Sequence, residues 1–389
     1  MSRIEFLIDS PDHQHYYGTA MTAPQWIWQQ PNWPDFTWQE CIVQPKLRAV
    51  HHTLGQLQGK ACLVEHDPSF SLDALLANII ASSAIESEEL DVYGVRSSLA
   101  RQLGIAIDSP VAVSDKSHGV ASLMKDTVTQ WQQPLTLDTL LQWHRWLFQG
   151  QTSLMHQVAG GELRGDAPMQ IVSGPIHKPK VHYQAPAREQ VDTQLNAFMA
   201  WFNQSLHDPL IDPIARAAIT HLWFISIHPF EDGNGRITRA LTDRALAQAD
   251  QHSIRLYAMS EAILEQRSQY YDVLEATQKG GMDITPWISW FCDALLDALD
   301  GALGKIDRTV FKAQFWLQHA DKTLAEPQRK VLNRLLDGDF EQGINATQYQ
   351  RVAKVSKATA TRHLTDLVEL GVFEKTAAGG RSTRYVITK

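Results

Sequence analysis

The feature that most constrains this chain is a short loop between two apolar segments. Residues 213–227 and 236–248 carry apolar side chains at three- and four-residue spacing, which is typical of buried helices. Between them runs His-Pro-Phe-Glu-Asp-Gly-Asn-Gly-Arg, residues 228–236. Pro229 disfavours a helical conformation at His228, so the first helix is expected to end there. The sequence therefore predicts a helix, a glycine-containing loop and a second helix whose first turn faces the loop.

This arrangement is suited to binding an anion. The first turn of a helix has unpaired N–H groups and the positive end of the helix dipole. Gly233 and Gly235 allow the backbone to curl with positive φ and to approach a ligand closely. Arg236 and Arg239 lie three residues apart and share a helix face, where two guanidinium groups can grip phosphate oxygens. The loop is therefore a candidate phosphate site.

Two further side chains of the loop suit phosphate chemistry. Asp232 supplies a carboxylate of the kind that binds a Mg²⁺ ion bridging phosphates. His228 can act as a general base near neutral pH. Each feature alone has an ordinary structural explanation, such as a capping histidine, a plain turn or a solvated arginine pair. Their occurrence within twelve residues favours the functional interpretation.

Most of the remaining chain has a helical pattern. Apolar side chains recur at helical spacing in residues 71–87, 136–149, 190–203, 212–227, 236–248 and 284–300. Residues 168–184 are the exception, because they form two short β-type runs around a Gly-Pro turn. We therefore expect a mainly α fold that contains one β-hairpin.

The two ends of the chain differ from this helical region. Near the N-terminus, Trp26, Trp28, Trp33 and Trp38 lie within thirteen residues. Such a cluster predicts an apolar cap, with a partner-binding surface as the alternative. Near the C-terminus, helices fit residues 326–336, 346–353 and 357–370, and the runs VFEKT and TRYVI predict a hairpin around Gly379 and Gly380. Three helices followed by a hairpin indicate a winged helix-turn-helix domain.

The candidate recognition helix is the third helix of this domain. The side chains expected to reach DNA are Lys357, Thr359, Thr361 and Arg362, with Arg381 and Arg384 on the wing. Leu364, Leu367 and Leu370 are expected to face inward. Residues 321–389 contain 12 Lys or Arg and 8 Asp or Glu, whereas the whole chain has a net charge of −8. This modest positive charge leaves protein contact or dimer packing open as an alternative.

Composition excludes several other classes of protein. The chain has 389 residues, of which 44% are hydrophobic and 20% charged, an ordinary balance for a globular protein. No stretch approaches the ~20 apolar residues of a membrane span, and the first residues have no signal-peptide core. The three cysteines, Cys41, Cys62 and Cys292, match no disulfide or zinc spacing. We expect a cytoplasmic protein without a membrane partner.

The sequence HPFEDGNGRITR at residues 228–239 resembles the signature of the Fic family, HxFx[DE]GNGRxxR, at every fixed position. Family members are mostly protein adenylyltransferases, which move AMP from ATP to a Ser, Thr or Tyr hydroxyl. The resemblance implies His228 as the base, Asp232 as the Mg²⁺ ligand and Phe230 as a buried anchor. It also implies phosphate binding by Gly233, Asn234, Gly235, Arg236 and Arg239, the last on the γ-phosphate.

Other segments gain an interpretation from this resemblance. Residues 170–183 resemble the hairpin flap that pairs with the target segment, with Ile171, Val172, Val181 and Tyr183 as its apolar residues. Tyr270 and Tyr271 stand where the family often places aromatic side chains near the adenosine, although packing within a helix is an equal alternative.

Residues 82–87, SSAIES, resemble the family's inhibitory sequence [ST]xxxE[GN], with Ser87 in place of the usual Gly or Asn. The resemblance implies that Glu86 forms an ion pair with Arg239 and so keeps the γ-phosphate from its productive position.

These observations predict three regions. Residues 1–110 form a Trp-rich extension with an inhibitory helix at 71–87, residues 111–320 the Fic core, and residues 321–389 the winged helix. The predicted function is a self-inhibited, ATP- and Mg²⁺-dependent protein adenylyltransferase. A de-AMPylase, or a DNA-binding regulator whose Fic core senses nucleotide, is the alternative. The expected partner is a target protein, and self-AMPylation, a homodimer and DNA are further candidates.

Overall fold

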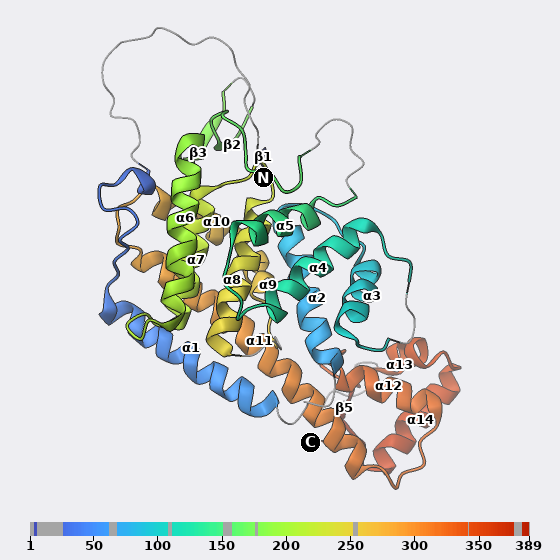
Figure 1. Cartoon of the computed structure of the whole chain (residues 1–389). Coiled ribbons are helices and arrows are strands. Elements are labelled where there is room, and N and C mark those ends of the chain that lie inside the picture. The colour runs from blue at the N-terminus through green and yellow to red at the C-terminus, as the bar shows by residue number, and fades with distance from the viewer. Residues whose placement is uncertain are drawn as a thin grey trace. The chain divides into compact units, whose positions relative to one another are not determined.

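The chain divides into two compact units in a computed structural model. The structure describes residues 4–5, 26–61, 68–107, 111–150, 158–175, 178–251, 256–340, 342–376 and 383–388. One unit comprises Met1–Gln58 and His66–Ala302, and the other Gly59–Glu65 and Leu303–Lys389. The fold is mainly helical, as the sequence predicted (Figure 1). The division into three regions stays a prediction.

The first unit is built from helices around a buried pair. Its helices are α1 (Glu40–Ala61), α2 (Pro68–Ile85), α3 (Val92–Leu103), α4 (Asp115–Thr129), α5 (Leu137–Leu147), α6 (Arg188–Gln204), α7 (Pro213–Ile227), α8 (Asn234–Asp250), α9 (Met259–Glu265), α10 (Arg267–Gln278) and the first part of α11 (Thr285–Gln318). Two short 3₁₀ helices, Ile27–Gln29 and Ser205–His207, lie between them. Nearly every residue of α7 and α8 is buried, so these two helices form the centre of the core (Figure 1).

Local sequence explains where this central pair begins and ends. The Asp212 side chain caps α7 by accepting from the Ile214 amide at 2.8 Å, and Pro213 occupies the first helical position. At the other end, His228 adopts a left-handed conformation with φ of +51° and stops the helix. Gly233, with φ of +81°, precedes the first residue of α8. The loop is thus held between two fixed helix ends.

The expected hairpin lies at residues 170–184. β2 (Gln170–Ser173) and β3 (Lys180–Gln184) are antiparallel, with Ile171 opposite Tyr183 and Val172 opposite Val181. A third strand, β1 (Ile4–Glu5), pairs with the other edge of β2. The sequence did not indicate β1, because a two-residue strand is too short to show periodicity. Within the described residues, β3 therefore carries the hairpin's unpaired edge.

Three of the clustered tryptophans pack within the first unit. Trp26 is buried edge-on against Tyr183, with ring centroids 5.4 Å apart. The Trp28 indole donates to the Gln184 carbonyl at 2.8 Å, and Trp33 packs edge-on against Trp223 at 6.2 Å. These contacts agree with an apolar cap and place it beside the hairpin.

The second unit has its own hydrophobic core. Its elements are the rest of α11, α12 (Glu326–Leu336), α13 (Ala346–Ala353), α14 (Lys357–Glu369), β4 (Phe373–Lys375) and β5 (Tyr385–Ile387). The order of three helices and two paired strands is the one predicted from the sequence. Leu364 and Leu367 are buried as expected, but Leu370 is 37% exposed because it lies just past the end of α14. Gly379, Gly380 and Arg381 lie outside the described residues, and the winged-helix assignment stays a prediction.

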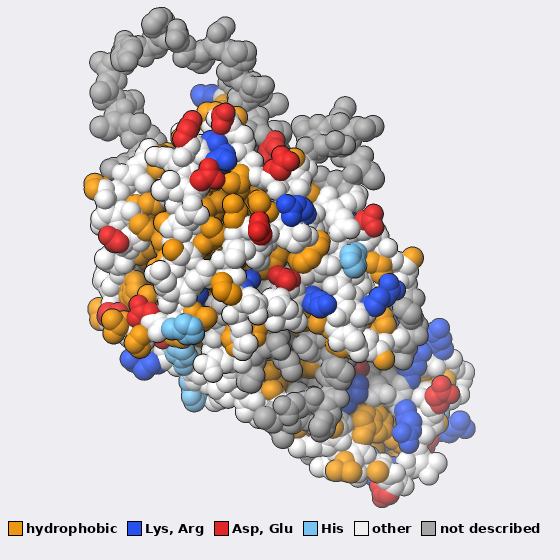
Figure 2. Space-filling view, in the orientation of Figure 1, with side chains coloured by type: hydrophobic (Ala, Val, Ile, Leu, Met, Phe, Trp, Pro, Cys, Tyr) orange, Lys and Arg blue, Asp and Glu red, His pale blue; other side chains and the backbone are white. Residues whose placement is uncertain are grey.

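The surface is mixed in character. On the face shown in Figure 2, acidic and basic side chains are scattered over the first unit, and Lys and Arg stand beside apolar groups on the second. In the described part of the chain, no helix combines the length and apolarity needed to cross a membrane. Cys41 is exposed and Cys292 is buried, both as free thiols, and Cys62 lies outside the described residues.

Candidate active site

The loop between α7 and α8 is closed by its own asparagine. The Asn234 side chain accepts from the Phe230 amide at 2.9 Å and donates to the Phe230 carbonyl at 2.8 Å. Phe230 is fully buried, as its role of anchor requires. The Asn234 side chain is therefore used to shape the loop, and any contact of this residue with phosphate is expected from its backbone.

His228 is held in a defined orientation. It is 1% exposed, and its Nδ1 lies 3.2 Å from the Ile225 carbonyl oxygen. Because a carbonyl oxygen can only accept, Nδ1 carries the proton in this contact. The basic nitrogen of the neutral ring is then Nε2. His228 also lines a pocket together with the hairpin and α10, so the ring is placed to take a proton there.

His144, on α5, supports the loop, and the sequence analysis missed it. It is fully buried and stacks on Phe230, with ring centroids 4.1 Å apart. Its Nδ1 accepts from the Gly161 amide at 2.8 Å, so its Nε2–H donates to the Asp232 carbonyl at 3.1 Å. Burial lowers the pKa of His144 to about 4, which keeps the ring neutral and in this tautomer. No local pattern marks His144, because its partners lie 17 to 88 residues away.

Arg164 is a second support that the sequence did not reveal. Its guanidinium donates to the His228 carbonyl at 2.8 Å and to the Pro186 carbonyl at 2.5 Å. Its own amide donates to the Pro229 carbonyl at 3.0 Å. Burial lowers the pKa of Arg164 to about 10, so it stays charged at neutral pH. Arg164 thereby joins the loop to the segment that follows β3.

Arg239 is occupied by the end of α2. Its Nη2 lies 2.7 Å from Glu86 Oε1 and donates to the Ser82 carbonyl at 2.8 Å, and its Nε donates to the Ser82 hydroxyl at 2.8 Å. Burial lowers the pKa of Arg239, but the adjacent Glu86 carboxylate outweighs this and raises it. Arg239 is 2% exposed and Glu86 27% exposed by side chain, so the pair lies at the edge of the interior.

Glu86 also lies close to the backbone of Gly235 in the first turn of α8. A Cβ placed on Gly235 would lie 2.1 Å from Glu86 Oε1 and 3.2 Å from Arg239 Nη1. Arg239 Nη1 is buried without a hydrogen-bond partner among the described residues. The glycine thus lets a carboxylate approach the first turn of α8, and the donor set around it suits a larger anion. This local chemistry fits the phosphates of a nucleotide.

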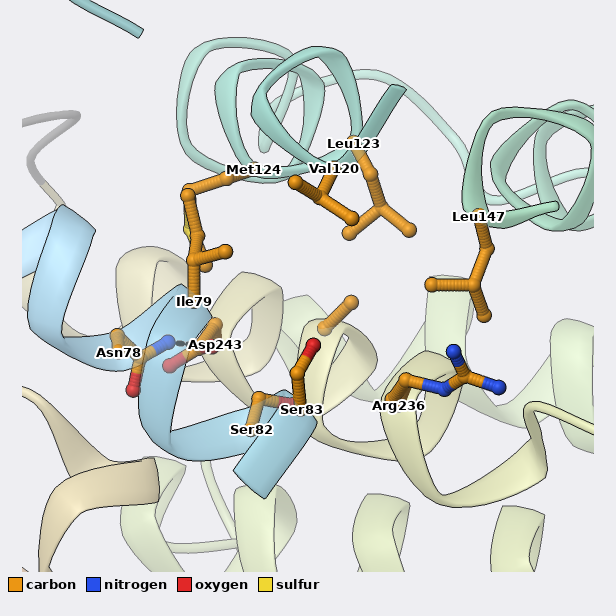
Figure 3. Close-up of a pocket in the computed structure, with 11 residues that line it drawn as sticks. Asn78, Ile79, Ser82, Ser83, Val120, Leu123, Met124, Leu147, Arg236 and Asp243 are labelled. Carbon is orange, nitrogen blue, oxygen red and sulfur yellow. Dashed lines mark hydrogen bonds between the residues drawn. The ribbon is translucent and has the colours of Figure 1, made fainter. Parts of the chain in front are cut away.

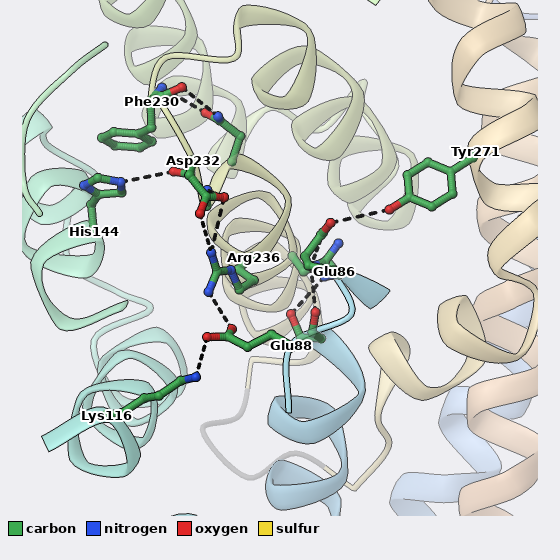
Figure 4. A network of polar contacts seen from close by, with 12 residues as sticks. Glu86, Glu88, Lys116, His144, Phe230, Asp232, Arg236 and Tyr271 are labelled. Atoms are coloured by element: carbon green, nitrogen blue, oxygen red, sulfur yellow. Dashed lines mark hydrogen bonds and ion pairs between the residues drawn. The ribbon is translucent and has the colours of Figure 1, made fainter. Parts of the chain in front are cut away.

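Arg236 is paired in a similar way. Its Nη1 lies 2.6 Å from Glu88 Oε2, and its Nη2 lies 3.4 Å from both carboxylate oxygens of Asp232 (Figure 4). The guanidinium also lies over the ring of Phe148, 5.2 Å from its centroid. The sequence analysis gave Glu88 no role and missed this contact.

The pocket beside His228 gathers half of the site residues expected from the sequence. It is lined by Glu86, Ile171, His182, Tyr183, Ile225, His228, Gly235, Tyr270, Tyr271, Leu274, Glu275 and Gln278. The Tyr271 hydroxyl donates to Glu86 Oε2 at 3.4 Å. The Tyr270 hydroxyl lies 3.0 Å from His221 Nε2. Tyr271 is therefore the one of the two whose hydroxyl meets Glu86.

Two of the four expected hairpin residues do not line this pocket. Ile171 and Tyr183 do, whereas Val172 is buried and Val181 packs against the cluster around Trp26. Tyr183 belongs to the same cluster as Val181, so the two side chains share apolar neighbours and differ in that Tyr183 also reaches the pocket.

Asp232 is suited to a metal that keeps water ligands. Its side chain is 45% exposed, and one oxygen accepts from the Gly233 amide at 2.5 Å. No group of three or more His, Cys, Asp or Glu side chains gathers around a common point in the described ranges. A single half-exposed carboxylate next to a phosphate site fits Mg²⁺, which usually takes one or two carboxylates together with substrate phosphates.

Comparison with known proteins agrees with this geometry. The Fic/DOC family model matches residues 134–246, which contain the whole loop and Arg239. A second model, described as a domain of unknown function (DUF4172), matches residues 26–105, which contain Glu86 and Glu88. The chain thus carries a Fic domain, and the resemblance seen in the sequence is confirmed.

Relatives and solved structures point the same way. A protein named Protein adenylyltransferase Fic from Aedes aegypti is 27% identical over 231 residues, which is 59% of this chain and 42% of that protein. One of the same name from Nematostella vectensis is 26% identical over 235 residues, 59% of this chain and 49% of that protein. The chain therefore matches less than half the length of these relatives. A crystal structure of a Fic family protein from Desulfovibrio desulfuricans shares the fold, with a TM-score of 0.50 and 20% identity, covering 91% of this chain and 98% of that one.

Proposed function

We propose that this chain is a protein adenylyltransferase that moves AMP from ATP to a Ser, Thr or Tyr hydroxyl of a target protein. The observation that carries the proposal is the position of His228, whose basic nitrogen is fixed by the Ile225 carbonyl beside an arginine-flanked anion site. The adenylyltransferase relatives support ATP as the co-substrate.

The reaction follows from the roles of these groups. The target hydroxyl oxygen attacks the α-phosphorus of ATP, its proton passes to His228 Nε2, and the bond to the bridging oxygen of pyrophosphate breaks. Arg236 and Arg239 hold the phosphates, so that the leaving group lies in line with the attack. A Mg²⁺ ion on Asp232 would neutralise part of the phosphate charge. The unpaired edge of β3 is the place where an extended target segment can add as a strand.

Glu86 acts as a brake on this reaction. Its carboxylate occupies Arg239 at 2.7 Å, and the γ-phosphate needs the same guanidinium. ATP bound beside an occupied Arg239 has its α-phosphate out of line with the hydroxyl. A displacement of about 1 Å can cost roughly 100-fold in rate.

Transfer of label from ATP tests the proposal. Wild type, Glu86→Gly and His228→Ala are incubated with Mg²⁺ and α-labelled ATP, alone and with a cell lysate, and +AMP is read by gel and mass spectrometry. We expect Glu86→Gly to label itself or a lysate protein roughly 10- to 100-fold more than wild type, and His228→Ala to give no label. Glu89→Gly is the matched control, because Glu89 is exposed and lies in the same segment. An unlabelled Glu86→Gly protein across these conditions would remove the transferase assignment.

Removal of AMP is the second candidate for the same site. Glu86 lines the pocket with His228 and is partly exposed, so it can orient a water toward an AMP-modified side chain. In that case Glu86→Gly abolishes release of AMP from a modified protein instead of promoting its attachment.

A further inference from the structure

Glu88 lies two residues beyond Glu86 and makes two close ionic contacts. One carboxylate oxygen is 2.6 Å from Arg236 Nη1, and the other is 2.7 Å from Lys116 Nζ on α4 (Figure 4). Glu88 and Glu86 thus each engage one of the two arginines of the loop signature. The side chain of Arg236 is 8% exposed and that of Glu88 22% exposed, so the pair is largely shielded from solvent.

The backbone explains how one short segment reaches both arginines. α2 ends at Ile85, and the amides of Glu86 and Glu88 both donate to the Ser83 carbonyl, at 3.1 and 3.0 Å. Between them Ser87 has a φ of +61°, a left-handed conformation that ends the helix in a tight turn. Gly or Asn adopts this conformation more easily than Ser, which agrees with their place in the related inhibitory sequence.

The surroundings of Arg236 make Glu88 its principal counter-charge. The other carboxylate nearby, Asp232, lies at 3.4 Å and is itself half-exposed. Arg236 Nε is buried and has no hydrogen-bond partner within the described residues. A guanidinium in such a place needs an anion, and a carboxylate and a phosphate are alternatives for the same donors. Lys116 holds the other oxygen of Glu88 and so fixes the carboxylate on Arg236.

We propose that Glu88 is a second carboxylate of the brake, which keeps Arg236 from the phosphates of ATP while Glu86 keeps Arg239 from them. Loss of the Glu86 contact then releases the enzyme in part, and full release requires both contacts to break as the end of α2 moves away. The regulatory meaning rests on the proposed function, but the competition between Glu88 and phosphate for Arg236 does not.

Packing around the end of α2 leaves space beside this contact. A cavity separates Ser82 and Ser83 of α2 from Val120 and Leu123 of α4, and Arg236 lies at its edge (Figure 3). Beside this cavity, the ion pair between Glu88 and Lys116 links the end of α2 directly to α4, and it breaks when that end moves.

Nucleotide binding tests the competition without requiring turnover. The Kd for ATP with Mg²⁺ is measured by calorimetry in the His228→Ala background, with and without Glu88→Gln. We expect Glu88→Gln to bind ATP about fivefold more tightly, the size of effect expected when a partly exposed ion pair no longer competes. Glu89→Gln removes the same charge from the neighbouring exposed residue and controls for long-range electrostatics. Equal Kd values for Glu88→Gln and Glu89→Gln would overturn the proposal.

Transfer activity distinguishes a brake from a support. With His228 intact, Glu86→Gly/Glu88→Gln is expected to label faster than Glu86→Gly, because both arginines are then available. Slower labelling by the double variant would mean that Glu88 orients Arg236 for catalysis, and the inference would be wrong. If Glu86→Gly shows no transfer but Glu88→Gln still tightens ATP binding, the proposed function fails and the role of Glu88 at Arg236 stands.

Discussion

Two buried histidines hold the site in place through fixed tautomers. His144 spans Gly161 and Asp232, as described above. The Thr242 hydroxyl donates its hydrogen to the Thr238 carbonyl, so it can only accept from His221 Nδ1. The other nitrogen of His221, Nε2, therefore carries no proton and accepts from the Tyr270 hydroxyl. Burial lowers the pKa of His144 to about 4 and that of His221 to about 3. Both rings are therefore neutral structural connectors at physiological pH.

These depressed pKa values predict a loss of stability in acid. As the pH falls below about 6.5, unfolded histidine takes up a proton that the folded rings refuse, so stability present above that pH is lost toward pH 4. Between pH 7 and pH 5, the free energy of unfolding should fall by about 2 kcal/mol for each of the two rings. Urea unfolding at the two pH values measures the change. His144→Phe keeps the stacking on Phe230 but cannot titrate, so its acid loss should be smaller than that of wild type by about one ring's share. Parallel losses in the two proteins would contradict this assignment.

At the scale of the elements, the hairpin is attached to the helical core by polar contacts. His182 on β3 lies 2.7 Å from Glu275 on α10 through Nδ1, and 2.6 Å from the Ser173 hydroxyl through Nε2. The Tyr183 hydroxyl donates to the Ser226 carbonyl at 2.5 Å on α7. The hairpin is therefore joined both to α7, which leads into the loop, and to α10, which lines the pocket.

Removal of His182 should loosen the hairpin selectively. His182→Ala breaks the contacts to both Ser173 and Glu275, and the hydrogen bond to the charged Glu275 carboxylate alone contributes about 1.5–3 kcal/mol. We expect amide exchange in residues 170–184 to accelerate about tenfold or more, with α7 unchanged. Hydrogen-exchange mass spectrometry reads both segments in one experiment. His207→Ala, at an exposed histidine, is the control. Equal amide-exchange rates in the hairpins of His182→Ala and His207→Ala would show that the hairpin is attached mainly by the apolar contacts around Trp26.

At the scale of the whole molecule, the local sequence pattern predicted the helices, the hairpin and the loop. It did not predict the distant side chains that hold the loop in place. The bounds of α12 and α13 agree with the predicted ranges, because helical spacing and caps are written in adjacent residues. The pairing of Glu86 with Arg239 agrees with the resemblance. Glu88, His144 and Arg164 were missed because each meets its partners across 17 to 148 residues, where sequence spacing carries no information.

The second unit presents an exposed set of polar side chains on α14. Lys357, Thr361 and Arg362 are exposed, whereas Thr359 is half-buried and its hydroxyl lies 2.9 Å from that of Ser356, the residue that caps the helix. Arg384 donates to the Gly343 carbonyl at 2.8 Å, and its side chain therefore has a structural role as well as the predicted one on the wing. These positions keep DNA binding as a proposal, with protein contact as the alternative.

Salt dependence separates the two. If α14 lies against DNA phosphates, full-length protein should bind duplex DNA with an affinity that falls steeply with salt, about 0.9 in logarithmic slope per phosphate contact. Lys357→Gln/Arg362→Gln should weaken binding and reduce the slope by about 2, as measured by fluorescence anisotropy across a salt series. Lys305→Gln/Lys330→Gln removes two exposed charges of the same unit outside α14 and should have a smaller effect. If neither wild type nor the control binds DNA even at low salt, the DNA-binding proposal is wrong. Protein contact through α14 then predicts that the Lys357→Gln/Arg362→Gln variant differs from wild type in oligomeric state, as measured by light scattering.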